Sequence, residues 1–311
     1  MKSREHFLRD LKTSQPSSLF ANPLTWRKIK SYIQTVFSDD LTAIDTADGS
    51  TKLGLQDKLK AKIGFSSLRT AFVGASPIEK ETLHWYEEKL GLSIAEGYGM
   101  SETLGLITVN TEGPAKFGSV GQVFDFCDVK ISENSEVLVK HEGLTLGYYE
   151  NEKKTKELFD KDGYLKTGDE GYFKDGSLYI TGRIGDSFKT AQSNWIYPAS
   201  LESKLTVHSK IVNACVIGAG RMQPCAVVDL CPSVSGEGKV EQARHDIKEY
   251  VAQMNATLEP RERLDRVVLT GFSWTTENRF MTSTMKVSRR HIQDKYENLE
   301  EFNELSVEVL D

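Results

Sequence analysis

The stretch LRTAFVGASPIEKETLHWYEEKLGLSIAEGYGMSET, residues 68–103, sets the fold class. Residues 68–77 have the pattern of a buried strand that ends in a Gly-Ala-Ser-Pro turn, and residues 78–91 that of a helix closed by Gly91. Residues 92–99 predict a second strand that runs into glycines. Strand, helix and strand in this order predict an open α/β layer, and ligands bind beyond the strand ends in such folds.

The end of this stretch, EGYGMSET at residues 96–103, has two interpretations. In the first it is a nucleotide site, with the Tyr98 ring under a base and with Ser101 and Glu102 directed towards phosphates and Mg²⁺. In the second a strand ends in a glycine turn, Ser101 caps the next helix and Glu102 lies in its first turn. These residues alone favour the second interpretation, because short motifs often occur by chance.

Composition excludes several classes of protein. The chain has 311 residues, enough for about two domains of ordinary size. Its net charge of −6, from 39 basic and 45 acidic residues, argues against a nucleic-acid partner. The sequence contains no apolar run of membrane-spanning length, and its first 16 residues lack the apolar core of a secretory signal. The four cysteines show no CxxC spacing, which predicts reduced, mostly buried thiols in a cytoplasmic protein.

The segments on either side complete the predicted architecture. Residues 1–14 and 23–38 predict helices, residues 38–54 a polar loop, and residues 55–64 a short helix ended by glycine. From about residue 118 the pattern changes to short alternating strands, with a strong hairpin signal at residues 174–177. These strands predict a small β unit or a distorted barrel.

The C-terminal part predicts a separate, compact α+β domain. Helices are expected at residues 199–206 and 239–256, and strands at 211–220, 225–232 and 264–273. The natural linker position is Gly185.

Three other motifs fail on their spacing. The GxG at residues 218–220 lacks the third glycine of a dinucleotide fingerprint, because Gln223 stands there. The stretch at residues 160–171 suggests a calcium loop but has Leu165 where such loops need glycine. The six histidines form no HExxH motif and no i, i+4 pair, so a zinc protease is not supported.

Three further positions are weak when taken singly. Asp169 follows a glycine and could bind both ribose hydroxyls, or could be an ordinary surface-turn aspartate. Arg183 could reach a hydroxyl or phosphate, or form a surface salt bridge. Residues 282–291 place Lys286 after a Thr/Ser run, where a lysine could neutralise charge in a transition state. A solvated basic face is the more frequent outcome for such a cluster.

Together these motifs occur in the order of the core motifs of the adenylate-forming (AMP-binding) superfamily. The resemblance runs from about residue 7 to residue 296 and rests on GASP (74–77), EGYGMSET (96–103), SEVLVKHEGLTLGYYENEKKT (135–155), YLKTGDEG (164–171), GRIGDSFK (182–189) and TSTMKVSRR (282–290). It is closest to the long-chain fatty acyl-CoA synthetases. Two segments resemble that branch: the Pro-Leu-Thr-Trp at residues 23–26 and the Thr-rich approach to Lys286.

The resemblance implies an α/β fold with two parts. Residues 1–184 would be the C-terminal part of the large adenylate-forming domain, an α/β layer plus a small β unit, and residues 185–311 a small mobile α+β domain. Such enzymes use ATP and Mg²⁺ to join a carboxylate to AMP, and then transfer the acyl group to a thiol, usually that of coenzyme A. The expected substrate is a fatty acid, and the expected localisation is cytoplasmic, with peripheral membrane contact left open.

The resemblance also implies a role for each matched residue. Tyr98 would stack on adenine beside Gly74, Ala75 and Ser76, within the glycine pair Gly97 and Gly99. Ser101 would contact phosphate and Glu102 would hold Mg²⁺, while Asp169 and Arg183 would bind the ribose. Lys286 would bridge the acyl carboxylate and the α-phosphate. Gly185 would be the hinge, with Asp186 as the next candidate, and Lys189 would lie on the switching loop.

Two departures from the family pattern matter. Gln192 and Ser193 replace two glycines beside the expected pantetheine channel, which leaves a carrier-protein pantetheine as an alternative acceptor to CoA. No Ser/Thr/Gly-rich phosphate loop occurs between Met1 and Phe65. We therefore expect an N-terminal half of the enzyme to be missing and to be needed for activity. That half would be a potential partner that covers an edge of the sheet containing residues 69–97. A non-catalytic, nucleotide- or partner-binding role is the third hypothesis, and the acyl length is not determined.

Overall fold

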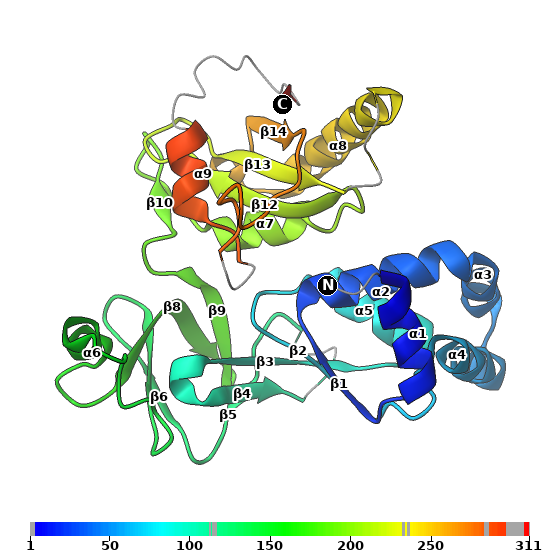
Figure 1. Cartoon of the computed structure of the whole chain (residues 1–311), viewed down its shortest axis with the longest axis horizontal. Helices are drawn as coiled ribbons and strands as arrows, with labels where there is room; N and C mark the ends of the chain where they lie inside the picture. Colours follow the sequence, from blue (N-terminus) through cyan, green and yellow to red (C-terminus); the bar gives the residue numbers. More distant parts are fainter. Residues whose placement is uncertain are drawn as a thin grey trace. The chain divides into compact units, whose positions relative to one another are not determined.

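The computed structural model describes residues 4–111, 113, 117–231, 234, 237–282, 286–296 and 308–310. The chain forms two compact units, residues 1–180 and 181–311, which are described separately (Figure 1). The contacts divide the chain slightly before the sequence-based boundary at 184/185, so a functional boundary at the hinge stays a prediction. None of the helices in the described ranges has the length and apolar character needed to span a membrane.

The first unit begins with an α/β layer. Strands β1, β2 and β3 are parallel, β4 and β5 follow antiparallel, and the strand order is β1-β2-β3-β4-β5. The elements of this layer are α1 (Arg4–Ser14), β1 (Ser18–Ala21), α2 (Pro23–Val36), α3 (Ser38–Thr46), α4 (Gly49–Ile63), β2 (Thr70–Val73), α5 (Lys80–Leu90), β3 (Ile94–Met100), the 3₁₀ turn Ser101–Thr103, β4 (Gly105–Asn110) and β5 (Gln122–Val123).

Helix α2 joins the helices to the sheet through a buried tryptophan. Trp26 is fully buried, and its indole Nε1–H donates to the Phe72 carbonyl oxygen on β2 at 3.0 Å. The Tyr86 hydroxyl on α5 donates to the Trp26 carbonyl oxygen at 2.6 Å, and the two rings meet edge to face at 5.2 Å. These contacts fix α2 and α5 against the sheet, because buried polar groups must find partners.

The predicted polar loop at residues 38–54 is wrong. Residues Ser38–Thr46 form α3 and Gly49–Ile63 form α4. Asp39 and Asp40 lie in the first turn of α3, where a helix N-terminus favours negative charge, and Ile44 is fully buried. Burial against the neighbouring helices therefore outweighs the low helix propensity of this polar, glycine-containing segment.

Strand β1 was not predicted from the sequence. Its residues Ser18–Ala21 pair in parallel with Thr70–Val73 of β2, so β2 is covered on that side. Strand β1 forms one end of the described strand order in the sheet that contains residues 69–97, and pairing of an N-terminal half with this sheet stays a prediction. A four-residue strand between polar segments gives too short a pattern to identify.

The small β unit of the first unit is an open antiparallel arrangement. Its order is β6-β7-β8-β9, formed by β6 (Asp128–Ile131), β7 (Glu136–Lys140), β8 (Leu165–Lys174) and β9 (Ser177–Arg183), with α6 (Glu152–Leu158) between β7 and β8. The predicted hairpin is confirmed: Asp175 and Gly176 connect β8 to β9, both with positive φ. A bridge between Gly121 and Leu178 links this sheet to the first one.

The second unit is the predicted α+β arrangement. The hairpin of β10 (Phe188–Lys189) and β11 (Trp195–Ile196) precedes α7 (Pro198–Leu205). A sheet of order β12-β13-β14-β15 follows, built from β12 (Ile211–Ile217), β13 (Cys225–Leu230), β14 (Arg266–Thr270) and β15 (Glu308–Leu310), with α8 (Glu237–Thr257), the 3₁₀ turn Pro260–Glu262 and α9 (Arg289–Tyr296).

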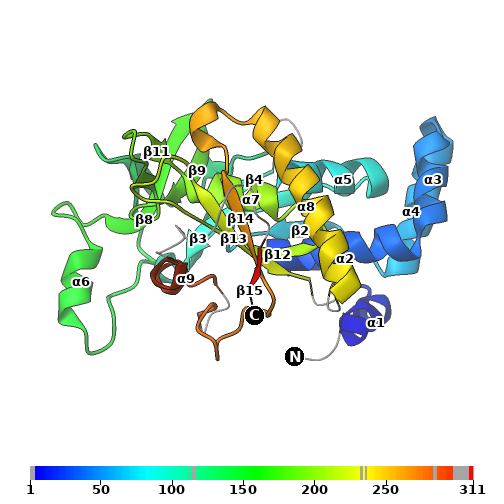
Figure 2. The ribbon, with the colours of Figure 1, turned by 90° about the horizontal axis from the view of Figure 1, so that it is seen from above.

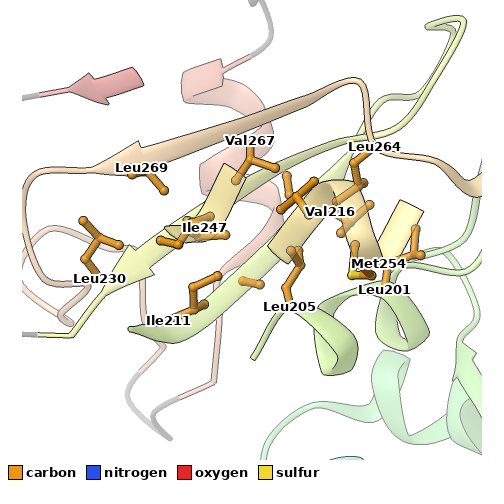
Figure 3. Packing of buried hydrophobic residues seen from close by; sticks show 14 of the residues in the cluster. Leu201, Leu205, Ile211, Val216, Leu230, Ile247, Met254, Leu264, Val267 and Leu269 are labelled. Carbon is orange, nitrogen blue, oxygen red and sulfur yellow. The ribbon is translucent and has the colours of Figure 1, made fainter. Parts of the chain in front are cut away.

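Each face of this sheet has its own hydrophobic core. On one face, α7 and α8 pack against alternate residues of β12, β13 and β14, and Figure 3 shows side chains of this cluster. The course of α8 can be followed in Figure 2. On the other face α9, Trp274 and Phe280 cover the intervening residues, which include Cys215 and Cys225. Neither cysteine forms a disulfide, which agrees with the predicted reduced thiols. The two covered faces explain why the central strand β13 is buried at every residue.

We expect Trp26→Phe to lower the free energy of unfolding by about 1–3 kcal/mol, because it leaves the buried Phe72 carbonyl without its donor and removes packed ring atoms. Chemical denaturation monitored by circular dichroism measures the change. The matched control is Trp195→Phe, whose side chain is 50% exposed and which should change stability by less than about 0.5 kcal/mol. Equal effects of the two substitutions would contradict the anchoring role of Trp26.

Candidate functional site

The carboxyl ends of β1, β2 and β3 meet at one edge of the first sheet. Gly74 follows β2 and is buried there, and a Cβ on it would lie 3.0 Å from the Gly97 carbonyl oxygen and 3.4 Å from the Phe20 ring. Ala75 and Ser76 follow as exposed residues, and Ala75 has a φ of 73°. This strained turn lies where open α/β sheets bind ligands.

Two predicted residues meet at this edge from strands 71 residues apart. The Tyr98 hydroxyl on β3 donates to Asp169 Oδ2 on β8 at 2.7 Å. Asp169 lies within a strand and is only 6% exposed, so the alternative of a surface-turn aspartate is wrong. A ring beside a buried carboxylate offers a stacking face and a strong acceptor within one small volume.

The backbone around Asp169 holds its carboxylate in place. The Asp169 amide donates to Thr167 Oγ1 at 3.1 Å, and that hydroxyl donates to the Val137 carbonyl at 2.7 Å. Gly168 has a φ of 70°, and its amide donates to Glu136 Oε1 at 3.0 Å. These contacts bend β8 where its register with β7 shifts, which directs Asp169 towards Tyr98.

The neighbouring strand requires glycine directly after Tyr98. A Cβ on Gly99 would lie 1.9 Å from the Gly105 carbonyl oxygen of β4, whereas one on Gly97 would meet only the end of the Leu106 side chain, at 2.9 Å. The register of β3 with β4 shifts between Tyr98 and Gly99. Close approach of the β4 backbone therefore explains Gly99.

After Met100 the chain makes a 3₁₀ turn, Ser101–Thr103, that presents Glu102. The Met100 amide donates to Thr103 Oγ1 at 3.0 Å, so Thr103 closes the turn and the predicted cap by Ser101 is wrong. Ser101 is exposed. The Tyr148 hydroxyl donates to Glu102 Oε1 at 2.7 Å and orients that carboxylate. Sequence reasoning missed Tyr148, although it lies in the Gly-Tyr-Tyr of the motif at residues 135–155.

The donor set fits a nucleotide better than an independent metal site. The described residues contain no group of three His, Cys, Asp or Glu side chains able to hold a metal ion. Glu102 provides a single carboxylate, which suits Mg²⁺ when phosphate oxygens and water complete its shell. Tyr98 and Asp169 suit a base and a ribose.

Glu96 is a buried acid on the same strand as Tyr98. Its side chain is 8% exposed, and burial raises its pKa to about 7. The Gly118 amide, which donates to Glu96 Oε1 at 3.1 Å, and the Lys80 ammonium offset part of this shift. Glu96 is therefore partly protonated near neutral pH.

The remaining predicted residues belong to the second unit. Arg183 ends β9 and is exposed, and the Asp186 amide donates to its carbonyl at 3.0 Å. Gly185 between them has a φ of 88°, and a Cβ on it would meet no atom within 4 Å, so flexibility of the backbone rather than space explains this glycine. The Lys189 ammonium lies 5.0 Å from the centroid of the Trp195 ring across the β10–β11 hairpin.

Lys286 has an exposed side chain, and its backbone is hydrogen-bonded to Thr282. Its amide donates to Thr282 Oγ1 at 3.1 Å, and its carbonyl accepts from the Thr282 amide at 2.8 Å. Arg290 is exposed, whereas Arg289, at the start of α9, is largely buried. Exposure of Lys286 and Arg290 agrees with either the catalytic role or a solvated basic face, whereas burial excludes the solvated face for Arg289.

Comparison with known proteins matches two families in chain order. Residues 1–149 match the family described as AMP-binding enzyme, and residues 188–301 match the AMP-binding enzyme C-terminal domain. A long-chain-fatty-acid–CoA ligase of Mycobacterium bovis is 30% identical over 256 residues, which cover 77% of this chain and 42% of the ligase. The peroxisomal long chain acyl-CoA synthetase 7 of Arabidopsis thaliana is 28% identical, with 75% and 38% covered. The chain thus spans about two-fifths of these relatives.

Solved structures show the same fold. The A-PCP didomain of a carboxylic acid reductase from Segniliparus rugosus, in complex with AMP, superposes with a TM-score of 0.72 at 20% identity, covering 97% of this chain and 43% of that one. The o-succinylbenzoate CoA synthetase of Bacillus subtilis, also in complex with AMP, has a TM-score of 0.65 at 21% identity, covering 94% and 54%. The predicted α/β fold of the adenylate-forming enzymes is confirmed.

We expect Glu96→Gln to flatten the pH dependence of stability. The raised pKa of Glu96 in the folded chain gives a stability contribution that is full below about pH 4.5 and is lost as pH rises through about 7. The loss between pH 5 and pH 8 is of order 3 kcal/mol. Thermal unfolding at both pH values measures it, with the exposed Glu88→Gln as control. A variant that keeps the full pH dependence would show that Glu96 is not its source.

Proposed function

Because the chain belongs to the AMP-binding family of adenylate-forming enzymes, we propose that it provides the nucleoside site and the lysine of a ligase that activates a fatty acid. The single observation that carries this proposal is the Tyr98–Asp169 pair, which joins a stacking ring to a buried carboxylate. The two residues come from separate motifs of the sequence. Their direct contact supports a shared ligand with an aromatic base and vicinal hydroxyls.

In the proposed reaction a carboxylate attacks the α-phosphate of ATP, which gives acyl-AMP and pyrophosphate. Tyr98 supports adenine beside the turn at Gly74, and Asp169 and Arg183 accept and donate hydrogen bonds at the ribose. Ser101 contacts phosphate, and the exposed ammonium of Lys286 neutralises charge between the acyl carboxylate and the α-phosphate. Mg²⁺, held by Glu102, would supply charge neutralisation on the phosphates.

The acyl group is then transferred to a thiol, and we propose coenzyme A as the acceptor. The β10–β11 turn supports a second candidate, the pantetheine of a carrier protein. Ser193 in this turn has a φ of 62°, a conformation that glycine adopts more readily. A serine there adds a side chain where the resembling enzymes have none, beside the channel that the resemblance assigns to pantetheine. A long-chain fatty acid is the proposed substrate, and peripheral membrane contact would suit it.

Isothermal titration of AMP into the 311-residue chain tests the nucleoside site. We expect Asp169→Asn to weaken AMP binding by about 10- to 150-fold, since a hydrogen bond to a charged acceptor contributes about 1.5–3 kcal/mol. Asp162→Asn, in an exposed position of the neighbouring loop, is the control and should bind AMP normally. Unchanged AMP affinity after Asp169→Asn would show that the Tyr98–Asp169 pair does not bind the nucleoside, and would contradict the proposal.

Lys286→Ala should lower acyl-AMP formation by about 10²- to 10³-fold and leave thioester formation from pre-made acyl-AMP unchanged. The half-reactions are assayed after residues 1–311 replace the matching part of a complete ligase of the family, because the chain spans about two-fifths of its relatives. Arg290→Ala, also exposed, is the charge-matched control. If both half-reactions fall together, Lys286 does not have the assigned role.

A further inference from the structure

Arg289 lies at the centre of a charged network in the second unit. Its guanidinium is held by Glu202 of α7, with Nη1–Oε1 at 2.7 Å and Nη2–Oε2 at 3.0 Å, and Nη1 also donates to the Val216 carbonyl of β12 at 2.8 Å. The Glu202 carboxylate in turn accepts the Val216 amide at 2.7 Å. Arg289 is 14% exposed and Glu202 17%, so this bidentate pair is a fixed anchor.

A second carboxylate reaches the same guanidinium from the predicted hinge. Asp186 Oδ2 lies 3.4 Å from Arg289 Nε, a distance too long and a direction too oblique for a hydrogen bond. The Asp186 side chain is 42% exposed, whereas the Arg289 Nε–H is buried and has no hydrogen-bond acceptor. The contact is therefore an ion pair of modest strength on an otherwise anchored arginine.

The backbone places this ion pair between two functional segments. Asp186 directly follows Gly185, whose positive φ gives the chain a turn closed by the Asp186 amide on the Arg183 carbonyl. Arg289 begins α9 three residues after Lys286, and the Ser288 amide fixes the intervening non-helical backbone to the Phe280 carbonyl at 2.8 Å. Because Arg289 lies further along the chain in the same unit, a large change of ψ at Asp186, the second hinge candidate, moves the Asp186 carboxylate away from Arg289.

We propose that Asp186 and Arg289 form a releasable latch, in which the hinge carboxylate closes onto the arginine that begins the helix after Lys286 and favours one of the two hinge conformations. Asp186 is a positioning residue in this proposal, which rests on the proposed function only for the role of the hinge. The Glu202 anchor keeps Arg289 in place when the latch opens, so opening exposes no unpaired buried charge. A weak contact suits an element that must open in every catalytic cycle.

Hydrogen–deuterium exchange on the 311-residue chain tests the latch. In Asp186→Asn, which keeps the shape and removes the charge, amides of residues 185–188 should exchange about two- to fivefold faster, the range expected for a partly exposed ion pair. Asp186→Glu keeps the charge and should retain slow exchange. Asp246→Asn breaks another ion pair of the same unit, with Lys210, and should leave these amides unchanged.

Three results would overturn the proposal: unchanged exchange in Asp186→Asn, equal acceleration in Asp186→Glu, or equal acceleration in Asp246→Asn. Thermal unfolding of each variant checks that the second unit remains folded. Because AMP titration is independent of the exchange measurement, a chain that fails to bind AMP but shows faster hinge exchange keeps the latch and loses the proposed function.

Discussion

The hydrogen bond between Tyr98 and Asp169 depends on nearly every local feature of the first unit. It requires β3 to pair in parallel with β2 up to Glu96 and then to approach β4 so closely that Gly99 has no space for a side chain. On the other side it requires β8 to bend at Gly168. A tyrosine and an aspartate that are 71 residues apart thus become one polar site because two strands each deviate from regular pairing.

The sequence predicts the elements of this unit best where a regular hydrophobic pattern extends over many residues. The strand–helix–strand pattern of residues 68–99 and the Asp-Gly hairpin at β8–β9 are recovered, because burial patterns and turn residues agree there. It fails at α3 and at β1. The sequence of α3 is polar and does not predict a helix, although burial of Ile44 stabilises one. Strand β1 has only four residues and is recognised as a strand only through its pairing with β2. In both cases tertiary contacts decide, and they are not visible in local sequence.

The candidate site follows the same rule. Motif residues such as Tyr98, Glu102 and Asp169 were found because their order along the chain is distinctive. Their orienting partners were not, since Tyr148 and Thr167 act through hydroxyl hydrogen bonds that form only in the folded chain. Arg289 was recognised only as one of a basic cluster, and burial on Glu202 separates it from its exposed neighbours. Sequence order identifies the groups that would touch a ligand, whereas the groups that hold them in place emerge from packing.

Tyrosine hydroxyls orient both carboxylates of the proposed site, Tyr98 on Asp169 and Tyr148 on Glu102. For Asp169, which is 6% exposed, this contact has a thermodynamic consequence. A buried carboxylate oxygen without a donor is unfavourable, because burial removes the water that would otherwise bind it. The Tyr98 hydroxyl provides such a donor and fixes the direction of one Asp169 oxygen, so an incoming sugar hydroxyl exchanges with or joins a donor of the same kind. The net gain in binding free energy per ribose hydrogen bond is then smaller than for an isolated bond. The pair contributes through geometry, because the phenol that orients the carboxylate belongs to the ring that would support the base. One side chain thus positions both base and sugar.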